Sequence, residues 1–306
     1  MRFAFEPLGQ ERSMRLLRQA VENGPSHAYL FLGPEGIGKR QSAVAFGQRL
    51  LNAATDRHPE LMILERDGAN IRIADIRRMQ EWMAHKPFTG RWKIVILADA
   101  DYLNAESANA LLKTLEEPPP YGVIILVAHR EALPPTIVSR CQVVRFQPLS
   151  PEMVEQVLID GGTQPADAGL LAALSGGSPG RAQVFAGANP RQMIQRAAEM
   201  LLAFRMGDAF AAYEAAEYLE KEKEIRDVYL NVLEALIAEA LRKASGISTG
   251  ALLDDASAES LAAIGIEGLN AMAWQIADGR RALNTNANGL ILFTNVFLRL
   301  QACAIG

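Results

Sequence analysis

Cysteine is scarce in this sequence, whose 306 residues include only Cys141 and Cys303. Two cysteines so far apart provide neither a disulfide framework nor a C-x-x-C metal site. Long apolar runs are missing as well, since no window reaches the roughly 18 uninterrupted apolar residues of a membrane-spanning helix. The N-terminus, "MRFAFEPLGQERS", lacks the apolar core of a signal peptide. These absences predict a cytoplasmic protein that makes no contact with membranes.

Positive charge is not in excess either, because the formal net charge is −4 at pH 7. An acidic chain does not attract nucleic acid through its overall field, so any DNA contact depends on a local basic patch or on partner subunits. The composition is that of globular proteins, with 49% hydrophobic and 22% charged residues. The length is sufficient for two or three domains, each with its own core.

Apolar segments alternate with helical ones in the first half of the chain. We expect strands at 29–32, 92–100, 122–129 and 142–149, with helices from Lys39 and from Ala105. Continuous apolar strands that alternate with helices indicate a parallel sheet covered on both faces. After Ser150, which resembles a helix cap followed by proline, strands disappear. We predict an α/β domain at 1–149, a small helical domain at 150–189 and an all-helical domain at 190–306.

The stretch "FLGPEGIGKR" matches the phosphate-binding pattern G-x-x-x-x-G-K from Gly33 to Lys39. Backbone N–H groups of a glycine-rich loop, together with the N-terminus of the following helix, bind phosphate, and the lysine reaches the outer phosphates. Gly33, Gly36, Gly38 and Lys39 are therefore candidate nucleotide-binding residues. The next residue, where serine or threonine holds magnesium, is Arg40. The acidic residues that complete such a site lie near 98–101, where spacing alone leaves their register ambiguous.

Three segments carry a family resemblance: "HAYLFLGPEGIGKR", "NAESANALLKTLEEPP" and "LPPTIVSRCQVVRFQPLS". The chain resembles the clamp-loader subgroup of AAA+ proteins over roughly residues 5–185. Counted from "NALLKTLEEPP", the family's magnesium-binding Asp falls on Ala98 and its catalytic Glu on Asp99. The alternative register makes Asp99 the magnesium ligand and leaves Ala100 in place of the Glu. Either way we expect no ATP hydrolysis by this chain alone, because charge neutralisation at the phosphates is lost.

The resemblance also implies roles for two arginines. In the family, the Arg of Ser-Arg-Cys, here Arg140, reaches across a subunit interface to a neighbour's γ-phosphate; the alternative is a local ion pair. The Arg that follows a glycine-rich turn, here Arg181 in "GGSPGRA", senses the subunit's own nucleotide or anchors the lid by an ion pair. The retained glycines and Lys39 favour binding of ATP or ADP, whereas the lost magnesium ligands weaken it. No metal site is expected, because the family's four-cysteine zinc module is missing from Gln48–Leu64.

As the resemblance implies, residues 1–149 form an AAA+ P-loop domain, 150–189 a helical lid and 190–306 a collar that closes a heteropentameric ring. The implied partners are the motor (gamma/tau) and delta subunits of the bacterial DNA polymerase III clamp loader, and through them the sliding clamp and primed DNA. The implied role is non-catalytic. Two alternatives stay open: an active AAA+ motor subunit or remodeller, and a nucleotide-sensing adaptor. For DNA contact the candidates are the helix start near Ser107 and Asn109 and five basic residues: Arg72, Arg77, Arg78, Lys86 and Arg91.

Overall fold

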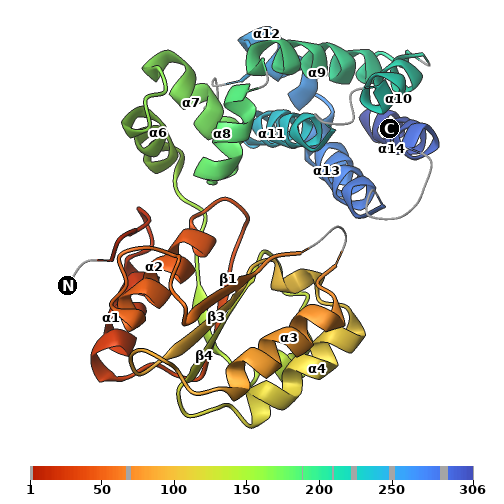
Figure 1. Ribbon diagram of the computed structural model, residues 1–306. Helices are drawn as coiled ribbons and strands as arrows, with labels where there is room; N and C mark the ends of the chain where they lie inside the picture. The colour runs from red at the N-terminus through yellow and green to blue at the C-terminus, as the bar shows by residue number, and fades with distance from the viewer. Residues whose placement is uncertain are drawn as a thin grey trace. The chain divides into compact units, whose positions relative to one another are not determined.

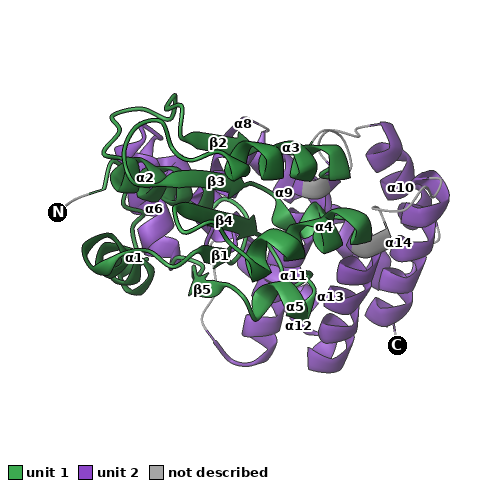
Figure 2. Ribbon diagram, turned by 60° about the horizontal axis from the view of Figure 1, so that its bottom comes forward, with its two compact units in different colours: residues 1–149 green, residues 150–306 purple. Residues whose placement is uncertain are grey.

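The computed structural model describes residues 3–66, 70–187, 189–208, 210–221, 226–247, 252–282 and 289–305. The chain divides into two compact units, Met1–Leu149 and Ser150–Gly306, which Figure 2 colours separately. The first unit contains both helices and strands, and the second has only helices as regular secondary structure in its described part. The division of the chain into three domains stays a prediction.

Five parallel strands form one sheet in the first unit (Figure 1), in the order β2-β3-β4-β1-β5, and Figure 2 labels all five. The strands are β1 (Ala28–Leu32), β2 (Leu61–Leu64), β3 (Lys93–Leu97), β4 (Gly122–Ala128) and β5 (Gln142–Arg145). Every neighbouring pair is parallel, so the carboxyl ends of all strands lie along the same edge. Loops that leave this edge are where open α/β sheets bind ligands. The predicted parallel sheet is confirmed, although the sequence did not reveal β2.

Helices cover both faces of the sheet, and the alternation along β1 shows how. Ala28, Leu30 and Leu32 belong to the core shared with α3 (Ile73–Ala84) and α4 (Ala105–Glu116). On the other face, the ring centroids of Tyr29 and Phe31 lie 5.1 Å and 6.5 Å from that of Phe46 in α2 (Lys39–Leu51). Helix α1 (Glu11–Asn23) packs beside α2. Because successive side chains point to opposite faces and both faces are covered, the strand reads as one continuous apolar run.

Two strands end earlier than the sequence suggested. Strand β3 stops at Leu97 rather than at Ala100, because Asp99 has a left-handed backbone (φ 58°, ψ 41°) that starts the 3₁₀ turn η1 (Ala100–Tyr102). Strand β5 stops at Arg145 rather than at 149. Just beyond it, the Gln147 N–H donates to the Gln10 side chain at 3.0 Å instead of to a strand, and Pro148 has no N–H to donate.

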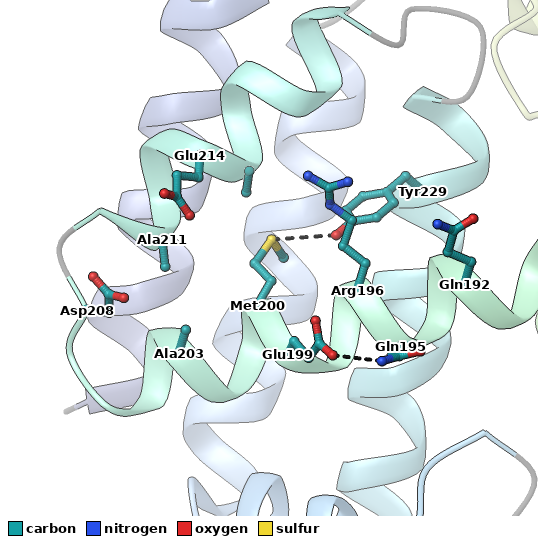
Figure 3. A pocket seen from close by; sticks show the side chains of 11 residues that line it. Gln192, Gln195, Arg196, Glu199, Met200, Ala203, Asp208, Ala211, Glu214 and Tyr229 are labelled. Carbon is teal, nitrogen blue, oxygen red and sulfur yellow. Dashed lines mark hydrogen bonds between the residues drawn. The ribbon is translucent and has the colours of Figure 1, made fainter.

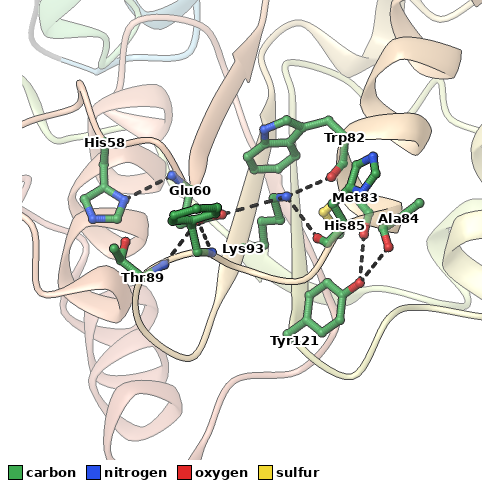
Figure 4. Close-up of polar contacts among 10 residues, drawn as sticks. His58, Glu60, Trp82, Met83, Ala84, His85, Thr89, Lys93 and Tyr121 are labelled. Carbon is green, nitrogen blue, oxygen red and sulfur yellow. Dashed lines mark hydrogen bonds and ion pairs between the residues drawn. The ribbon is translucent and has the colours of Figure 1, made fainter.

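At the amino ends of the strands, a buried ion pair fixes the loop between α3 and β3 (Figure 4). Glu60 and Lys93 have side chains only 3% and 6% exposed, and their nearest charged atoms are 3.8 Å apart. The Glu60 carboxylate accepts from the backbone N–H groups of Phe88 and Thr89. Lys93 Nζ donates to the carbonyls of Trp82 (2.8 Å) and His85 (2.9 Å). We call this set of contacts the amino-end network.

The second unit contains nine helices in its described part. They are α6 (Pro151–Asp160), α7 (Pro165–Leu174), α8 (Pro179–Gly187), α9 (Pro190–Arg205), α10 (Ala211–Lys221), α11 (Arg226–Ala244), α12 (Asp255–Ala262), α13 (Gly265–Ala282) and α14 (Gly289–Ile305). Ser150 caps α6 by accepting from the Met153 N–H, and Pro151 occupies the first turn, as predicted. Phe297 of α14 packs against Phe204 of α9, with ring centroids 6.0 Å apart. No helix of the described chain combines the length and apolarity needed to cross a bilayer.

Candidate functional site

Gly33, Gly36 and Gly38 form the turn that joins β1 to α2, with φ of 153°, 75° and 91°. A Cβ atom at Gly33 would lie 2.3 Å from the Phe146 carbonyl oxygen, so a side chain does not fit there. Among the described residues, the N–H groups of Gly36 and Gly38 have no hydrogen-bond acceptor. They are therefore available to an oxyanion at the N-terminus of α2. The predicted strand, loop and helix are confirmed, and nucleotide binding by Gly33, Gly36, Gly38 and Lys39 stays a prediction.

Lys39, the first residue of α2, is buried and points across its own loop. Its Nζ donates to the Pro34 carbonyl and lies 3.1 Å from His129 Nδ1. The other ring nitrogen of His129, Nε2, lies 2.9 Å from Asp99 Oδ1. A lysine ammonium can only donate, so Nδ1 accepts and the ring hydrogen sits on Nε2, directed at Asp99. Lys39, His129 and Asp99 follow β1, β4 and β3, so the parallel sheet brings all three together; we call them the carboxyl-end network.

The two positions expected to have lost magnesium ligands carry no suitable oxygen. Arg40 pairs with Glu65 at the end of β2. Ala98 is buried directly after β3, where its N–H donates to the Leu64 carbonyl at 2.9 Å. Magnesium requires a near-octahedral set of oxygen ligands, and a guanidinium with a methyl group does not provide one. In the described part of the chain, no three His, Cys, Asp or Glu side chains are grouped to hold a metal. Positions 40 and 98 therefore provide no ligand for a magnesium ion.

Further cations surround this edge of the sheet, and the sequence analysis did not identify them. Arg66 Nε lies 3.7 Å from Asp99 Oδ2, and its guanidinium carbon lies 4.3 Å from the centroid of the Tyr102 ring. Arg130 Nε lies 3.4 Å from Asp101 Oδ2. Arg66, His129 and Arg130 each stand one or two residues after a strand. That position is the signal that could have identified them, since parallel strands end together.

Arg140 lies between the short helix α5 (Pro135–Val138) and β5, partly exposed. Its guanidinium donates to the Thr136 carbonyl and pairs with Glu116 Oε1 at the end of α4, with donor–acceptor distances of 2.8 Å and 2.7 Å. In the isolated chain Arg140 thus makes the local ion pair that the sequence left open as an alternative. Its role across a subunit interface stays a prediction, because no partner chain is present.

Cys141, next to Arg140, is a packed side chain. It lies against the core that α3 and α4 share with the sheet. Burial raises the pKa of the Cys141 thiol to about 11, so the sulfur is protonated at neutral pH. The thiol is therefore a small apolar group rather than a nucleophile.

Arg181 follows a glycine-rich turn in the second unit. Gly176 and Gly177 have positive φ (59° and 83°), and the Ser178 hydroxyl accepts from the Arg181 N–H at 3.2 Å. These contacts start α8. The phosphate loop belongs to the first unit and Arg181 to the second, so both predicted roles of Arg181, nucleotide sensing and lid anchoring, stay open.

The helix start proposed for DNA contact is partly corrected by the structure. Asn104 caps α4 by accepting from the Ser107 N–H at 2.8 Å, and the Ser107 hydroxyl donates to the Ile71 carbonyl. Ser107 is completely buried. Its N–H is therefore not available to a phosphate. The prediction overlooked the asparagine, which satisfies this orphan donor from the N-cap position just before the helix.

A cavity of about 510 Å³ opens between α9, α10 and α11 in the second unit (Figure 3). The guanidinium carbon of Arg196 lies 3.6 Å from the centroid of the Tyr218 ring, and the Tyr229 hydroxyl donates to Met200 Sδ at 3.8 Å. Burial raises the pKa of Tyr229, so its hydroxyl stays protonated. The lining also includes Glu199, Asp208 and Glu214. Because the lining comes from separate helices, no sequence motif indicated it.

Comparison with known proteins gives the first unit a family likeness. Residues 9–150 match the family model described as "DNA polymerase III, delta subunit". A curated DNA polymerase III subunit delta' from Bacillus subtilis is 34% identical over 181 residues, covering 53% of this chain and 55% of the relative. The subunit delta' of Pseudomonas aeruginosa is 36% identical over 200 residues, covering 57% and 60%. The matched region thus spans somewhat more than half the length of these relatives.

Among solved structures, a DNA polymerase III gamma subunit-related protein from Thermotoga maritima covers 95% of this chain and 99% of its own, with 20% identity and a TM-score of 0.45. The chain thus resembles DNA polymerase III subunits delta', and the family model matches residues 9–150. The α/β P-loop unit expected of an AAA+ protein, followed by helices, is confirmed.

Proposed function

From this match of residues 9–150 to a DNA polymerase III subunit family, we propose that the chain is a delta-prime-type subunit of a bacterial clamp loader. It helps to close a heteropentameric ring with motor (gamma/tau) and delta subunits. The ring loads the sliding clamp on primed DNA during replication. In this assembly the chain does not hydrolyse ATP and supplies Arg140 to a neighbouring motor subunit.

The observation that carries the proposal is the contrast between a phosphate loop without magnesium ligands and an intact Ser-Arg-Cys segment. Arg40 and Ala98 occupy the two magnesium positions. Arg140, in contrast, is partly exposed and held by two contacts. Such a chain has lost the means to hydrolyse its own nucleotide while retaining a cation to offer to another subunit.

A guanidinium suits this role because it is planar, permanently charged and carries five N–H donors. The Thr136 carbonyl supports Arg140 through Nη1, and Glu116 engages Nη2 at the surface. A neighbour's γ-phosphate competes with Glu116 for Nη2, while Nη1 keeps its contact with the Thr136 carbonyl. Arginine delivered in this way stabilises the charge that develops on the transferred phosphoryl group.

An active motor subunit is the first alternative, and Arg40 together with Ala98 argues against it. A nucleotide-sensing adaptor is the second. It would use Gly33, Gly36, Gly38 and Lys39 without needing Arg140. The dependence of a partner's turnover on Arg140 separates this alternative from the proposal.

The test is the ATPase rate of a reconstituted loader that contains the motor and delta subunits, the clamp and primed DNA. Arginine fingers contribute about 10³- to 10⁵-fold to the rate of the site they serve. We expect Arg140→Ala to abolish the turnover of the one motor site that faces this subunit and to leave ring assembly intact by size-exclusion chromatography. Arg145→Ala is the matched control, because Arg145 is a nearby exposed arginine paired with Glu131. Equal turnover with Arg140→Ala and Arg145→Ala would contradict the proposal.

A further inference from the structure

The phosphate loop has the backbone conformation of an anion-binding turn, but its lysine is bound to other groups of the protein. The loop glycines have the conformations of an anion-binding turn, and two of their N–H groups have no acceptor in the described chain. Lys39, whose ammonium would reach the outer phosphates of a nucleotide, is only 3% exposed and folds over the loop to the Pro34 carbonyl. Within the described chain these two N–H groups therefore lack an acceptor, while the lysine is already engaged by the protein.

His129 engages Lys39 from outside the loop. Its Nδ1 lies 3.1 Å from Lys39 Nζ, within hydrogen-bond distance. Asp99 accepts from Nε2 at 2.9 Å and thereby fixes the tautomer that leaves Nδ1 free to accept. Asp99 is in turn oriented by Arg66, with 3.7 Å between the nearest nitrogen and oxygen atoms. A lysine ammonium has three N–H donors, and the imidazole occupies one that a phosphate oxygen would otherwise take.

We propose that His129, positioned by Asp99, is a latch on the phosphate-loop lysine and lowers the affinity of this site for nucleoside di- and triphosphates. This inference rests on the proposed function only in treating the loop as a nucleotide site. The latch explains how a chain can retain every glycine of the loop and its lysine and still hold nucleotide weakly. It is a second obstacle to binding, distinct from the loss of magnesium ligands at positions 40 and 98.

The test is binding of ADP to the purified full-length chain, by calorimetry in EDTA and again with magnesium. The net contribution of a typical intramolecular hydrogen bond changes an equilibrium about 3- to 10-fold. We expect His129→Ala to bind ADP about 3- to 10-fold more tightly than the unmodified chain in both buffers. Asp99→Asn loosens the latch without removing it, so we expect a smaller gain, about 2-fold. His85→Ala is the matched control, because His85 is an exposed histidine at the opposite edge of the sheet, and it should change nothing.

Two further measurements separate a latch from a general structural effect. In the double variant His129→Ala with Lys39→Ala the gain must disappear, because it acts through the lysine. In ¹⁵N-histidine spectra of the free chain, Lys39→Ala must shift the ring-nitrogen resonances of His129, whose Nδ1 loses its donor. Unchanged or weaker ADP binding by His129→Ala, or a gain that persists without Lys39, overturns the proposal. Neither result bears on Arg140, whose test reads a partner's turnover.

Discussion

The same sheet carries a lysine network at each end, and the two are built in opposite ways. In the amino-end network, Lys93 and Glu60 are buried, and their polar atoms bond to backbone groups of the end of α3 and of the loop that follows it. In the carboxyl-end network, Lys39 bonds to His129 and His129 to Asp99, with side chains of His129 and Asp99 that are 24% and 30% exposed. The first network has backbone partners that nothing from solution can replace. The second has side-chain partners that a phosphate can replace.

Burial explains why the amino-end network is structural. Removing two charges from water costs several kcal/mol per ion, and only complete hydrogen bonding offsets that cost. The result is a fixed loop, whose tip, Phe88, is 97% exposed while its N–H is held by Glu60. At the carboxyl edge Lys39 is buried as well, but the side chains of His129 and Asp99 remain partly exposed, so a solute can reach them. A lysine's role thus depends on whether its partners can be exchanged.

The largest effect we predict comes from breaking the amino-end network. Lys93→Met leaves Glu60 buried without a counter-ion and leaves the Trp82 and His85 carbonyls without their donor. Loss of one member of a buried pair costs about 3–5 kcal/mol. We expect urea denaturation, followed by circular dichroism, to show a decrease of this size in the free energy of unfolding.

The matched control for this prediction is Lys86→Met, a lysine in the same loop whose side chain is exposed. Surface substitutions usually change stability by no more than about 0.5 kcal/mol. If Lys93→Met costs no more than Lys86→Met, the amino-end network does not hold the loop, and the contrast between the two ends of the sheet is wrong.

A smaller effect is expected at Cys141 of the Ser-Arg-Cys segment. Arg140 has a surface partner that can be exchanged, whereas the adjacent Cys141 is packed against the core. With its pKa raised to about 11 by burial, Cys141 carries roughly one thiolate per thousand thiols at pH 8. An ordinary thiol with a pKa of about 8.5 carries roughly a quarter. Because a more basic thiolate is also the stronger nucleophile, the difference in reaction rate is about tenfold smaller than the difference in thiolate fraction. We therefore expect Cys141 to react with an aromatic disulfide about 20-fold more slowly than free cysteine at pH 8.

The pH dependence of that reaction has a definite sign. The rate for Cys141 should keep rising as the pH approaches 11, where its thiolate forms, whereas the rate for free cysteine levels off above pH 9. The protonated thiol favours the folded state below the ordinary pKa, and this contribution is lost as the pH rises toward 11. Labelling is read by mass spectrometry of the peptide that contains Cys141. A reaction as fast as that of free cysteine at pH 8 would mean that Cys141 is not packed.

The sequence predicted what is local in this molecule. The glycine spacing from Gly33 to Lys39 identified the loop, and continuous apolar runs gave four of the five strands. Strand β2 was missed because four apolar residues, Leu61–Leu64, are too few to show a period. Its place in the sheet comes from pairing with β3, far along the chain.

The carboxyl-end network could not be predicted for a related reason. Its members come from the ends of β1, β3 and β4, and the order β2-β3-β4-β1-β5 decides which of these ends are neighbours. Sequence spacing contains no information on that order, since each parallel connection crosses over through a helix. His129 was visible only as the last residue of an expected strand. Its contact with Lys39 becomes visible only in the folded structure, where β4 pairs with β1.

The smallest effect we predict is that of Asp99→Asn, which removes a charge from the carboxyl-end network. It tests the comparison between the two networks most directly. Asp99→Asn keeps the size of the side chain and an oxygen that can accept from His129 Nε2, while the ion pair with Arg66 is lost. Exposed ion pairs contribute about 0–1 kcal/mol, and asparagine tolerates the left-handed backbone that Asp99 adopts (φ 58°). We expect the free energy of unfolding to change by less than about 1 kcal/mol, measured by the same urea titration as for Lys93→Met. A loss as large as that of Lys93→Met would mean that the carboxyl-end network also holds the fold, and its side chains would then not be free to exchange partners with a phosphate.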